Sequence, residues 1–287
     1  MFDDVISRRA LLRGGLAGLG GLAILGACDP TAAGATNYPV GAFVLSSDLY
    51  AAADPQRFVF VLQQGTANGI MFVSGPAATV RFRPPKGTWT KPVAAPLDRA
   101  GLSKGRGVYV ASTVLSTPGI WSVEAKVAGK TVPFKIQVND RSEVVLVGQP
   151  AVRAASPTLA NPLGVNPICT RQPACPLHTV SLADVIGAGR PVAALFATPA
   201  RCQSQYCGPV LDELLKVMPA YADKVTFVHV EIYQAATGTA LCPTVSAWNL
   251  PSEPWLFGID AGGTVVSRID GAFGGTEMKK LLSALAR

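Results

Sequence analysis

The sequence predicts two domains of different structural class, an antiparallel β-sandwich followed by an α/β domain. Short β-branched and aromatic runs, separated by Pro and Gly, fill the first half of the chain, and two of them alternate with a period of two. Further on, an unbroken apolar run at 191–198 precedes an amphipathic segment, which is typical of a strand buried on both faces and followed by a helix. A chain of 287 residues, 49% of them hydrophobic, has enough apolar surface for two cores.

The β-sandwich is predicted for residues 40–140. Its clearest part is a hairpin, because alternate positions from Trp121 to Val127 are apolar and the same period resumes from Val132 to Val138. Several such strands without a convincing helix among them suggest an immunoglobulin-like sandwich, although the region lacks the cysteines of true immunoglobulin domains. The strands expected here are 58–62, 79–83, 107–114, 120–127 and 131–138.

A Pro-rich connector is predicted for residues 141–180, with a strand-like segment at 143–147. The α/β domain follows at 181–287. The segment Ser181–Asp184 has the spacing of a helix capping box, with Asp in place of the usual Glu or Gln. The remaining expected elements are a strand at 191–198, a helix beginning near 208, a strand at 225–232, a short helix at 243–250, hairpin strands at 255–259 and 264–270, and a helix at 276–286.

The first 27 residues predict an exported lipoprotein. Arg8 and Arg9 precede a Gly/Leu/Ala run and resemble a twin-arginine export signal, while the small residues before Cys28 resemble a bacterial lipobox. The alternative is a retained membrane anchor, but the uncharged stretch 14–27 is shorter than the ~20 residues that span a bilayer. We therefore expect a lipidated Cys28, a flexible tether at 28–39, and a protein anchored at the extracytoplasmic face of the bacterial cell membrane.

The charge pattern argues against some partners. The net charge is +7, but no dense Lys/Arg run and no basic stripe interleaved with aromatic residues occurs, so nucleic-acid binding is not expected. No Ser/His/Asp set, phosphate-binding loop or paired-carboxylate motif stands out. The expected contact with the membrane is through the N-terminal lipid.

Cysteine spacing predicts disulfides, because exported proteins are not kept reduced by thiol buffers. With Cys28 lipidated, the remaining cysteines form two close pairs and one single residue: Cys169 with Cys175, Cys202 with Cys207, and Cys242.

The segment around the first pair also suits a metal. Thiolates of Cys169 and Cys175 together with the imidazole of His178 are ligands for Cu(I) or Zn(II). A structural disulfide is favoured, given export and the lack of an obvious fourth ligand. His229 lies inside an apolar run and is expected to be a hydrogen-bonded core residue.

Residues 181–287 resemble the thioredoxin superfamily. Phe196-Ala197-Thr198-Pro199 leads from the first central strand into a cysteine pair at a helix start, and Ser252-Glu253-Pro254-Trp255 stands where that family has its cis-proline. The resemblance implies that Cys202 and Cys207 are redox-active. It also implies that Pro254 is cis and turns the preceding backbone toward the sulfurs.

The chain departs from that family in the spacing of the pair, because four residues separate the cysteines instead of two. If Cys202 matches the first cysteine of the family, it attacks and Cys207 resolves; if Tyr206-Cys207-Gly208-Pro209 matches Trp-Cys-Gly-Pro, Cys207 attacks. A position at a helix N-terminus favours Cys207 as the more acidic thiol, whereas exposure in a loop favours Cys202. In either case residues 202–206 must be loop for the sulfurs to meet.

Three functions follow from these observations. The first is a membrane-tethered thiol–disulfide oxidoreductase that acts on thiols and disulfides of exported proteins without a cofactor. In it, Glu253 either assists proton transfer or is a solvated loop charge. The second is a copper-binding protein of the Sco type, with Cys202, Cys207 and His178 as ligands. The third is a non-catalytic exported binding protein whose cysteine pairs are inert disulfides.

Overall fold

The computed structural model describes residues 41–66, 69–73, 75–99, 102, 107–202 and 206–287. The predicted signal segment 1–27, the lipidation site Cys28 and the predicted tether 28–39 lie outside the described residues. None of the helices in the described ranges has the length and apolar character needed to cross a bilayer.

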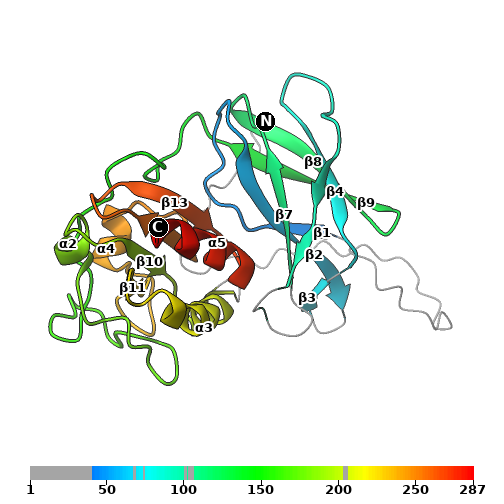
Figure 1. The fold of residues 1–287 in the computed structure, drawn as a ribbon. Coiled ribbons are helices and arrows are strands. Elements are labelled where there is room, and N and C mark those ends of the chain that lie inside the picture. Colours follow the sequence, from blue (N-terminus) through cyan, green and yellow to red (C-terminus); the bar gives the residue numbers. More distant parts are fainter. Residues whose placement is uncertain (1–40, 67–68, 74, 100–101, 103–106, 203–205) are drawn as a thin grey trace.

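The N-terminal half is an antiparallel sandwich of two sheets (Figure 1), so the predicted all-β class is confirmed. Its strands are β1 (Gly41–Val44), β2 (Gln56–Thr66), β3 (Gly69–Val73), β4 (Ala78–Arg83), β5 (Val93–Ala95), β6 (Leu97–Asp98), β7 (Val108–Thr113), β8 (Gly119–Val127) and β9 (Lys130–Val138). One sheet has the order β1-β2-β7-β6, with β3 paired to β2, and the other has the order β5-β4-β8-β9.

The five strands predicted from β-branched and aromatic runs are β2, β4, β7, β8 and β9. β1, β3, β5 and β6 were not predicted, because runs of two to five residues contain too few positions to show a period.

The β8–β9 hairpin shows how the sequence specifies the sandwich. Trp121 and every second residue to Val127 are buried, as the alternation predicts. The strands turn at Ala128 and Gly129, which have φ angles of 48° and 76°. Two successive positive φ angles are typical of the tight turns that match the twist of a hairpin, and glycine adopts them without steric cost.

The C-terminal half is an α/β domain around a four-stranded mixed sheet. Its elements are α2 (Leu182–Val185), β10 (Val192–Phe196), α3 (Cys207–Val217), the 3-10 turn η1 (Met218–Ala220), β11 (Thr226–Val230), α4 (Pro243–Ala247), β12 (Trp255–Ile259), β13 (Val265–Asp270) and α5 (Gly275–Leu285). The strand order is β11-β10-β12-β13; β10 and β11 are parallel, and β12 is antiparallel to both of its neighbours. The predicted order of elements is confirmed.

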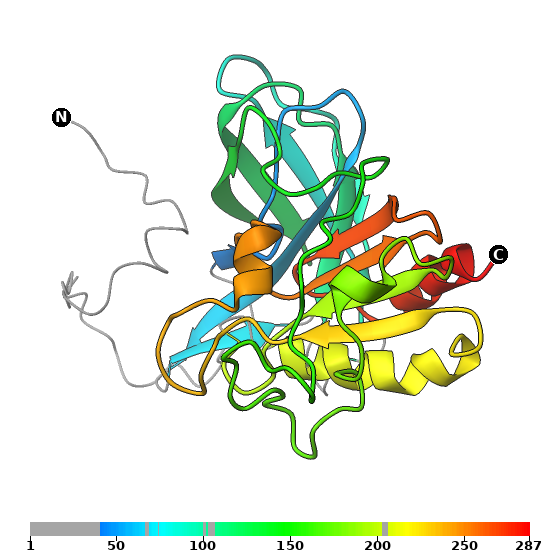
Figure 2. The same cartoon turned by 90° about the vertical axis from the view of Figure 1, so that its left-hand side faces the viewer.

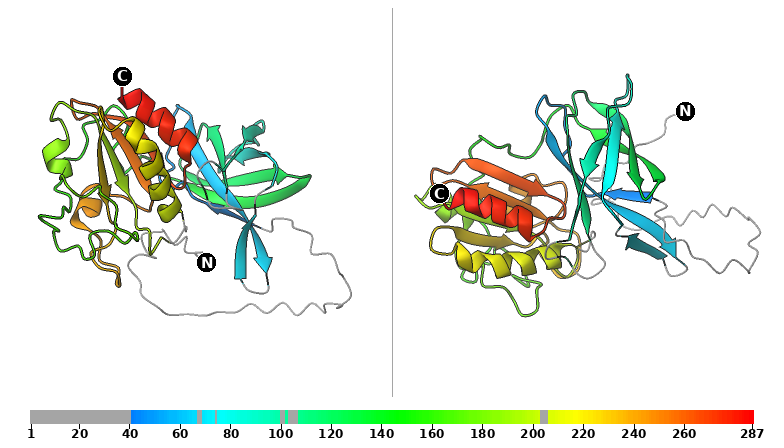
Figure 3. Two further views of the ribbon diagram at one scale, coloured as in Figure 1. Left: turned by 60° about the horizontal axis from the view of Figure 1, so that its bottom comes forward. Right: turned by 45° about the vertical axis from the view of Figure 1, so that its right-hand side comes forward.

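Both faces of this sheet are covered by helices. Alternate residues of β10 belong to two different cores: Val192, Ala194 and Phe196 pack with α2 and α4, whereas Ala193 and Leu195 pack with α3 and α5. Figure 3 shows α3 and α5 side by side on one face. The apolar run at 191–198 is thus explained by burial on two sides.

The connector is part of the α/β domain and not a loose link. Figure 2 shows it running from the sandwich along the C-terminal half. Gly148 and Ala151 donate backbone hydrogen bonds to Val265 and Gly263 at 2.8 Å each, so this segment pairs with the edge of β13. Val144, Ala151 and Val165 are buried in the core of that domain.

Two local predictions in this region are wrong. Residues 143–147 do not form a strand, because the carbonyl oxygens of Val144 and Val145 accept hydrogen bonds from the side chain of Arg268 instead of from a neighbouring strand. The capping box at Ser181 is not formed either: its hydroxyl oxygen accepts a hydrogen bond from the backbone N–H of Ser156 at 2.8 Å. The first N–H of α2, that of Leu182, donates instead to the hydroxyl oxygen of Ser156 at 2.9 Å.

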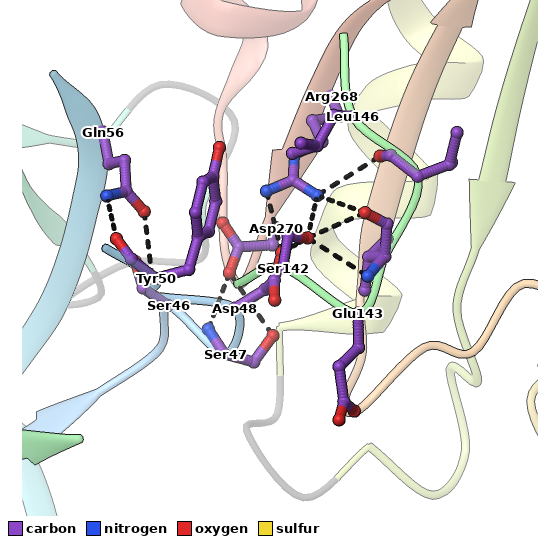
Figure 4. A network of polar contacts seen from close by, with 12 residues as sticks. Ser46, Ser47, Asp48, Tyr50, Gln56, Ser142, Glu143, Leu146, Arg268 and Asp270 are labelled. Atoms are coloured by element: carbon purple, nitrogen blue, oxygen red, sulfur yellow. Dashed lines mark hydrogen bonds and ion pairs between the residues drawn. The ribbon is translucent and has the colours of Figure 1, made fainter. Parts of the chain in front are cut away.

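The two domains share a polar interface (Figure 4). Arg268 of β13 forms an ion pair with the buried carboxylate of Asp48 at 2.8 Å, and the backbone N–H of Ser47 donates to the Asp270 carboxylate at 2.7 Å. Burial raises the pKa of Asp270. On the same side, Arg57 of β2 is paired with Glu277 of α5 at 2.7 Å. The predicted separate cores therefore meet across a structured boundary.

Candidate redox site

A disulfide links Cys202 and Cys207, whose Cα atoms are 5.7 Å apart. Cys207 is the first residue of α3 and is completely buried, whereas Cys202 precedes the helix and is partly exposed. The backbone N–H of Cys207 donates a hydrogen bond to the sulfur of Cys202 at 3.2 Å. The pair therefore consists of one accessible sulfur and one covered sulfur, with an N–H group of the helix start directed at the accessible one.

The local sequence places the pair at this point. The apolar strand β10 ends at Phe196, and the chain then turns, with the N–H of Arg201 bonded to the carbonyl oxygen of Thr198 at 3.2 Å. Pro209 lies in the first turn of α3, where its missing N–H costs nothing. Because Cys202 lies before the helix, the two sulfurs can bond although five positions separate them.

The Glu253–Pro254 peptide bond is cis, as the resemblance implied. Pro254 directly precedes β12, which lies next to β10 in the sheet. A carboxylate oxygen of Glu253 lies within 4.8 Å of both sulfurs of the Cys202–Cys207 pair. The sequence motif around the proline therefore contributes an ionisable group to the site as well as a turn.

The Glu253 carboxyl has a strongly altered proton affinity. Burial, together with the nearby carboxylate of Glu231, raises the pKa of Glu253 from its usual value of 4.5 to about 8. A carboxyl group with that pKa can exchange a proton near neutral pH, which is the range in which thiols must gain or lose one.

Glu231 was not singled out from the sequence. It follows β11 and is buried, and burial raises its pKa. Its carboxylate accepts hydrogen bonds from the backbone N–H and the hydroxyl of Thr170 at 2.6 and 3.0 Å. A glutamate inside the apolar run 225–232 was a signal that could have found it, since buried carboxylates are rare unless they have a partner or a role.

Tyr206 connects the sandwich to the Cys202–Cys207 pair. It precedes Cys207, is completely buried, and packs in a cluster that contains residues of both domains: Leu45, Val59, Val61, Val108 and Ala272. The covered sulfur therefore lies next to the interface between the domains.

The other cysteines differ from expectation. Cys169 and Cys175 are free, so the structure does not contain the disulfide predicted between them. A hydrogen bond between the two thiols lowers the pKa of Cys169 and raises that of Cys175. Cys242, predicted as the single cysteine, is free and buried, with its sulfur 3.5 Å from the hydroxyl of Thr244.

The alternative copper ligands Cys202, Cys207 and His178 do not form one group. His178 lies with Cys169, Cys175 and His229, whereas Glu253 is the residue that lies with the redox pair. His229 is a buried, hydrogen-bonded strand residue, as expected, but it also faces this second cluster.

No protein-family model and no curated protein matches the chain. Among solved structures, the Lin-41 filamin domain is 14% identical with a TM-score of 0.24, and the match covers 36% of this chain and 97% of that one. A thioredoxin family thiol:disulfide interchange protein from Chlorobium tepidum TLS is 15% identical with a TM-score of 0.34, covering 50% and 99%. A putative thiol:disulfide interchange protein DsbE from Chlorobium tepidum is 15% identical with a TM-score of 0.35, covering 50% and 100%. At these values the likenesses support no conclusion about function.

Proposed function

We propose that this protein is a membrane-tethered, extracytoplasmic thiol–disulfide oxidoreductase that acts on exported proteins through Cys202 and Cys207. The observation that carries the proposal is the placement of the pair. A partly exposed sulfur accepts a hydrogen bond from the start of α3, its partner is buried, and a carboxyl group with a pKa of about 8 lies beside both. Perturbed ionisable groups next to an accessible sulfur are typical of working cysteines.

The chemistry is a two-step exchange. The Cys202 thiolate attacks one sulfur of a client disulfide, a new S–S bond forms, and one client thiolate leaves. The Cys207 thiolate then attacks the Cys202 sulfur and expels the second client thiolate, so the client gains two electrons and the Cys202–Cys207 pair loses them. The same steps in reverse oxidise a client dithiol.

We propose that Cys202 makes the first attack, and its exposure and hydrogen bonding support this choice. A buried Cys207 sulfur is poorly placed to meet a client protein but well placed to reach the neighbouring Cys202 sulfur. The N–H of Cys207 stabilises negative charge on Cys202, as unpaired donors at helix starts do.

Glu253 serves as the proton acceptor and donor for the covered thiol. In its neutral form it can protonate a departing thiolate, and in its ionised form it can accept the proton of the Cys207 thiol. Cys207 has little access to water, so a neighbouring carboxyl group supplies the proton path.

Trapping of clients tests this function. Cys207→Ser, expressed with its own export signal, should accumulate mixed disulfides with exported proteins, whereas Cys202→Ser should accumulate none. Cys242→Ser is the matched control, because it removes a buried thiol away from the pair and should trap nothing. A pair in the purified protein that stays oxidised well below about −300 mV would identify an inert structural disulfide and overturn the proposal.

The tether has its own test. Cys28→Ser should release the protein from the membrane fraction, and Arg8→Lys with Arg9→Lys should stop export. Membrane recovery of the Cys28→Ser protein equal to that of the unchanged protein would show a retained anchor instead of a lipid.

A further inference from the structure

Four potential metal ligands meet in the α/β domain apart from the redox pair. The Sγ atoms of Cys169 and Cys175 and one ring nitrogen each of His178 and His229 all lie within 4.8 Å of one another. The four residues are 3%, 6%, 2% and 0% exposed. Three of them come from the connector, and His229 comes from β11.

The distances suit a tetrahedral ion. Nε2 of His178 is 3.2 Å from Nδ1 of His229, the sulfur of Cys175 is 3.3 Å from both of these atoms, and the sulfur of Cys169 is 3.9 Å from Nδ1 of His229. Ligands bound to tetrahedral zinc at ~2.0–2.3 Å lie roughly 3.3–3.8 Å from one another. Small shifts would therefore complete the coordination shell.

Hydrogen bonds around the cluster orient its side chains for metal binding. Nε2 of His229 lies 3.0 Å from the carbonyl oxygen of Ala197, and a carbonyl can only accept, so this nitrogen carries the hydrogen. The lone pair is then on Nδ1, which faces the sulfurs. Metal-binding histidines are oriented in this way by a carbonyl or carboxylate on their other nitrogen. The backbone N–H of Cys175 also donates to the sulfur of Cys169, at 3.4 Å.

We propose that Cys169, Cys175, His178 and His229 bind one Zn²⁺ ion. Four protein ligands in a buried, closed shell are typical of structural zinc sites. Charge distinguishes the metals: two thiolates and two neutral imidazoles around Zn²⁺ form a neutral unit, whereas Cu⁺ would leave one net negative charge in the interior, which is costly.

The ion would hold the connector against β11 and the loop before Cys202 within the α/β domain. Thr170, next to Cys169, accepts a hydrogen bond from the N–H of Ala200 at 3.2 Å, two residues before Cys202. Arg171 forms an ion pair with Asp212 of α3 at 2.7 Å. Zinc at this position would thus brace the loop that precedes the attacking cysteine.

Metal content and a cobalt spectrum test the proposal on the full chain. Protein purified in the presence of reductant should contain one zinc per chain. Replacement of zinc by Co²⁺ should give the intense visible bands of a tetrahedral ion and a sulfur-to-cobalt charge-transfer band in the near ultraviolet. This measurement needs no variant, so it does not depend on a variant that folds.

Variants then locate the ion. Cys169→Ser and His229→Ala should each weaken Zn²⁺ binding by at least ~10–100-fold. Loss of a residue that only hydrogen-bonds to a metal ligand already weakens metal binding by that factor. One zinc per chain should remain in the double variant Cys202→Ser/Cys207→Ser and in the single variant Cys242→Ser. Zinc binding by the double variant would show that the zinc site does not depend on the proposed redox function. Reduced protein that holds no zinc, holds only Cu⁺, or loses zinc with the Cys202/Cys207 pair would overturn the proposal. A disulfide between Cys169 and Cys175 would also overturn the proposal, if protein isolated without reductant contains it and cannot bind zinc after reduction. Peptide mass spectrometry maps this disulfide.

Discussion

The hydroxyl of Tyr206 lies 3.4 Å from the carbonyl oxygen of Gly107, to which it donates a hydrogen bond across the domain boundary. The residue directly before Cys207 is therefore anchored in the sandwich. This contact gives the sandwich a physical connection to the Cys202–Cys207 disulfide, because a shift between the domains would move the start of α3.

Tyr206→Ala should destabilise the protein by about 3 kcal/mol, since a completely buried aromatic ring is removed from a cluster shared by both domains. Tyr206→Phe keeps the ring and removes the hydroxyl that donates the long hydrogen bond to Gly107, so its cost should stay below about 1 kcal/mol. Urea unfolding measures both. Equal losses for the two variants would mean that the hydroxyl, and not ring packing, holds the domains together at this point.

Arg57→Ala should weaken the domain interface strongly. Its guanidinium binds both carboxylate oxygens of Glu277 at 2.7 Å and the carbonyl oxygens of Asp270 and Ala272 at 2.6 and 2.7 Å, with only 18% and 22% of the paired side chains exposed. Loss of these bonds should lower the free energy of unfolding by about 2–3 kcal/mol.

The matched control for that variant is Arg81→Ala. Arg81 is paired with Glu124 within one sheet of the sandwich, and 43% of its side chain is exposed, so its loss should cost less than about 1 kcal/mol. Similar values for the two variants in urea unfolding would show that the ion pair between the domains adds no special stability.

Stability should fall with rising pH because of Glu253. Its pKa is about 8 in the folded protein and near 4.5 in the unfolded chain, so between these pH values the folded state holds a proton that the unfolded state has released. The stabilisation by the neutral carboxyl is fully present below pH 4.5 and is lost as pH rises through 8. The loss is on the order of a few kcal/mol.

Glu253→Gln should reduce this pH dependence. The variant and the unchanged protein should have similar unfolding free energies at pH 4, which is below both pKa values of Glu253, and the variant should be the more stable of the two at pH 9. Urea unfolding at a series of pH values checks the slope, and parallel curves for the two proteins would contradict the raised pKa.

In the reduced protein, Cys202 should react with iodoacetamide on the order of 10–100-fold faster than Cys207. Cys202 is partly exposed and accepts an N–H hydrogen bond, whereas Cys207 is covered. Peptide mass spectrometry after timed alkylation gives the ratio, with buried Cys242 as an internal slow reference. Faster modification of Cys207 would reverse the assignment of the attacking sulfur.

Features that depend on neighbouring residues could be predicted from the amino-acid sequence alone. Alternation along Trp121–Val127 and the apolar run at 191–198 predicted strands with the correct faces buried, because burial on a strand follows a short period. The close spacing of Cys202 and Cys207 before Pro209 predicted their disulfide, and the motif around Pro254 predicted the cis bond. The same local reasoning paired Cys169 with Cys175, and there it was wrong.

Contacts between residues that lie far apart in the sequence are visible only in the folded protein. His229 meets Cys169 although 60 positions separate them, and Tyr206 meets Gly107 across 99 positions. Neither contact produces a periodic pattern of residues from which it could be predicted. The first follows from the path of the connector over the end of β11, and the second from the way the sandwich packs on the α/β domain, and both are set by the burial of surfaces whose residues lie far apart in sequence.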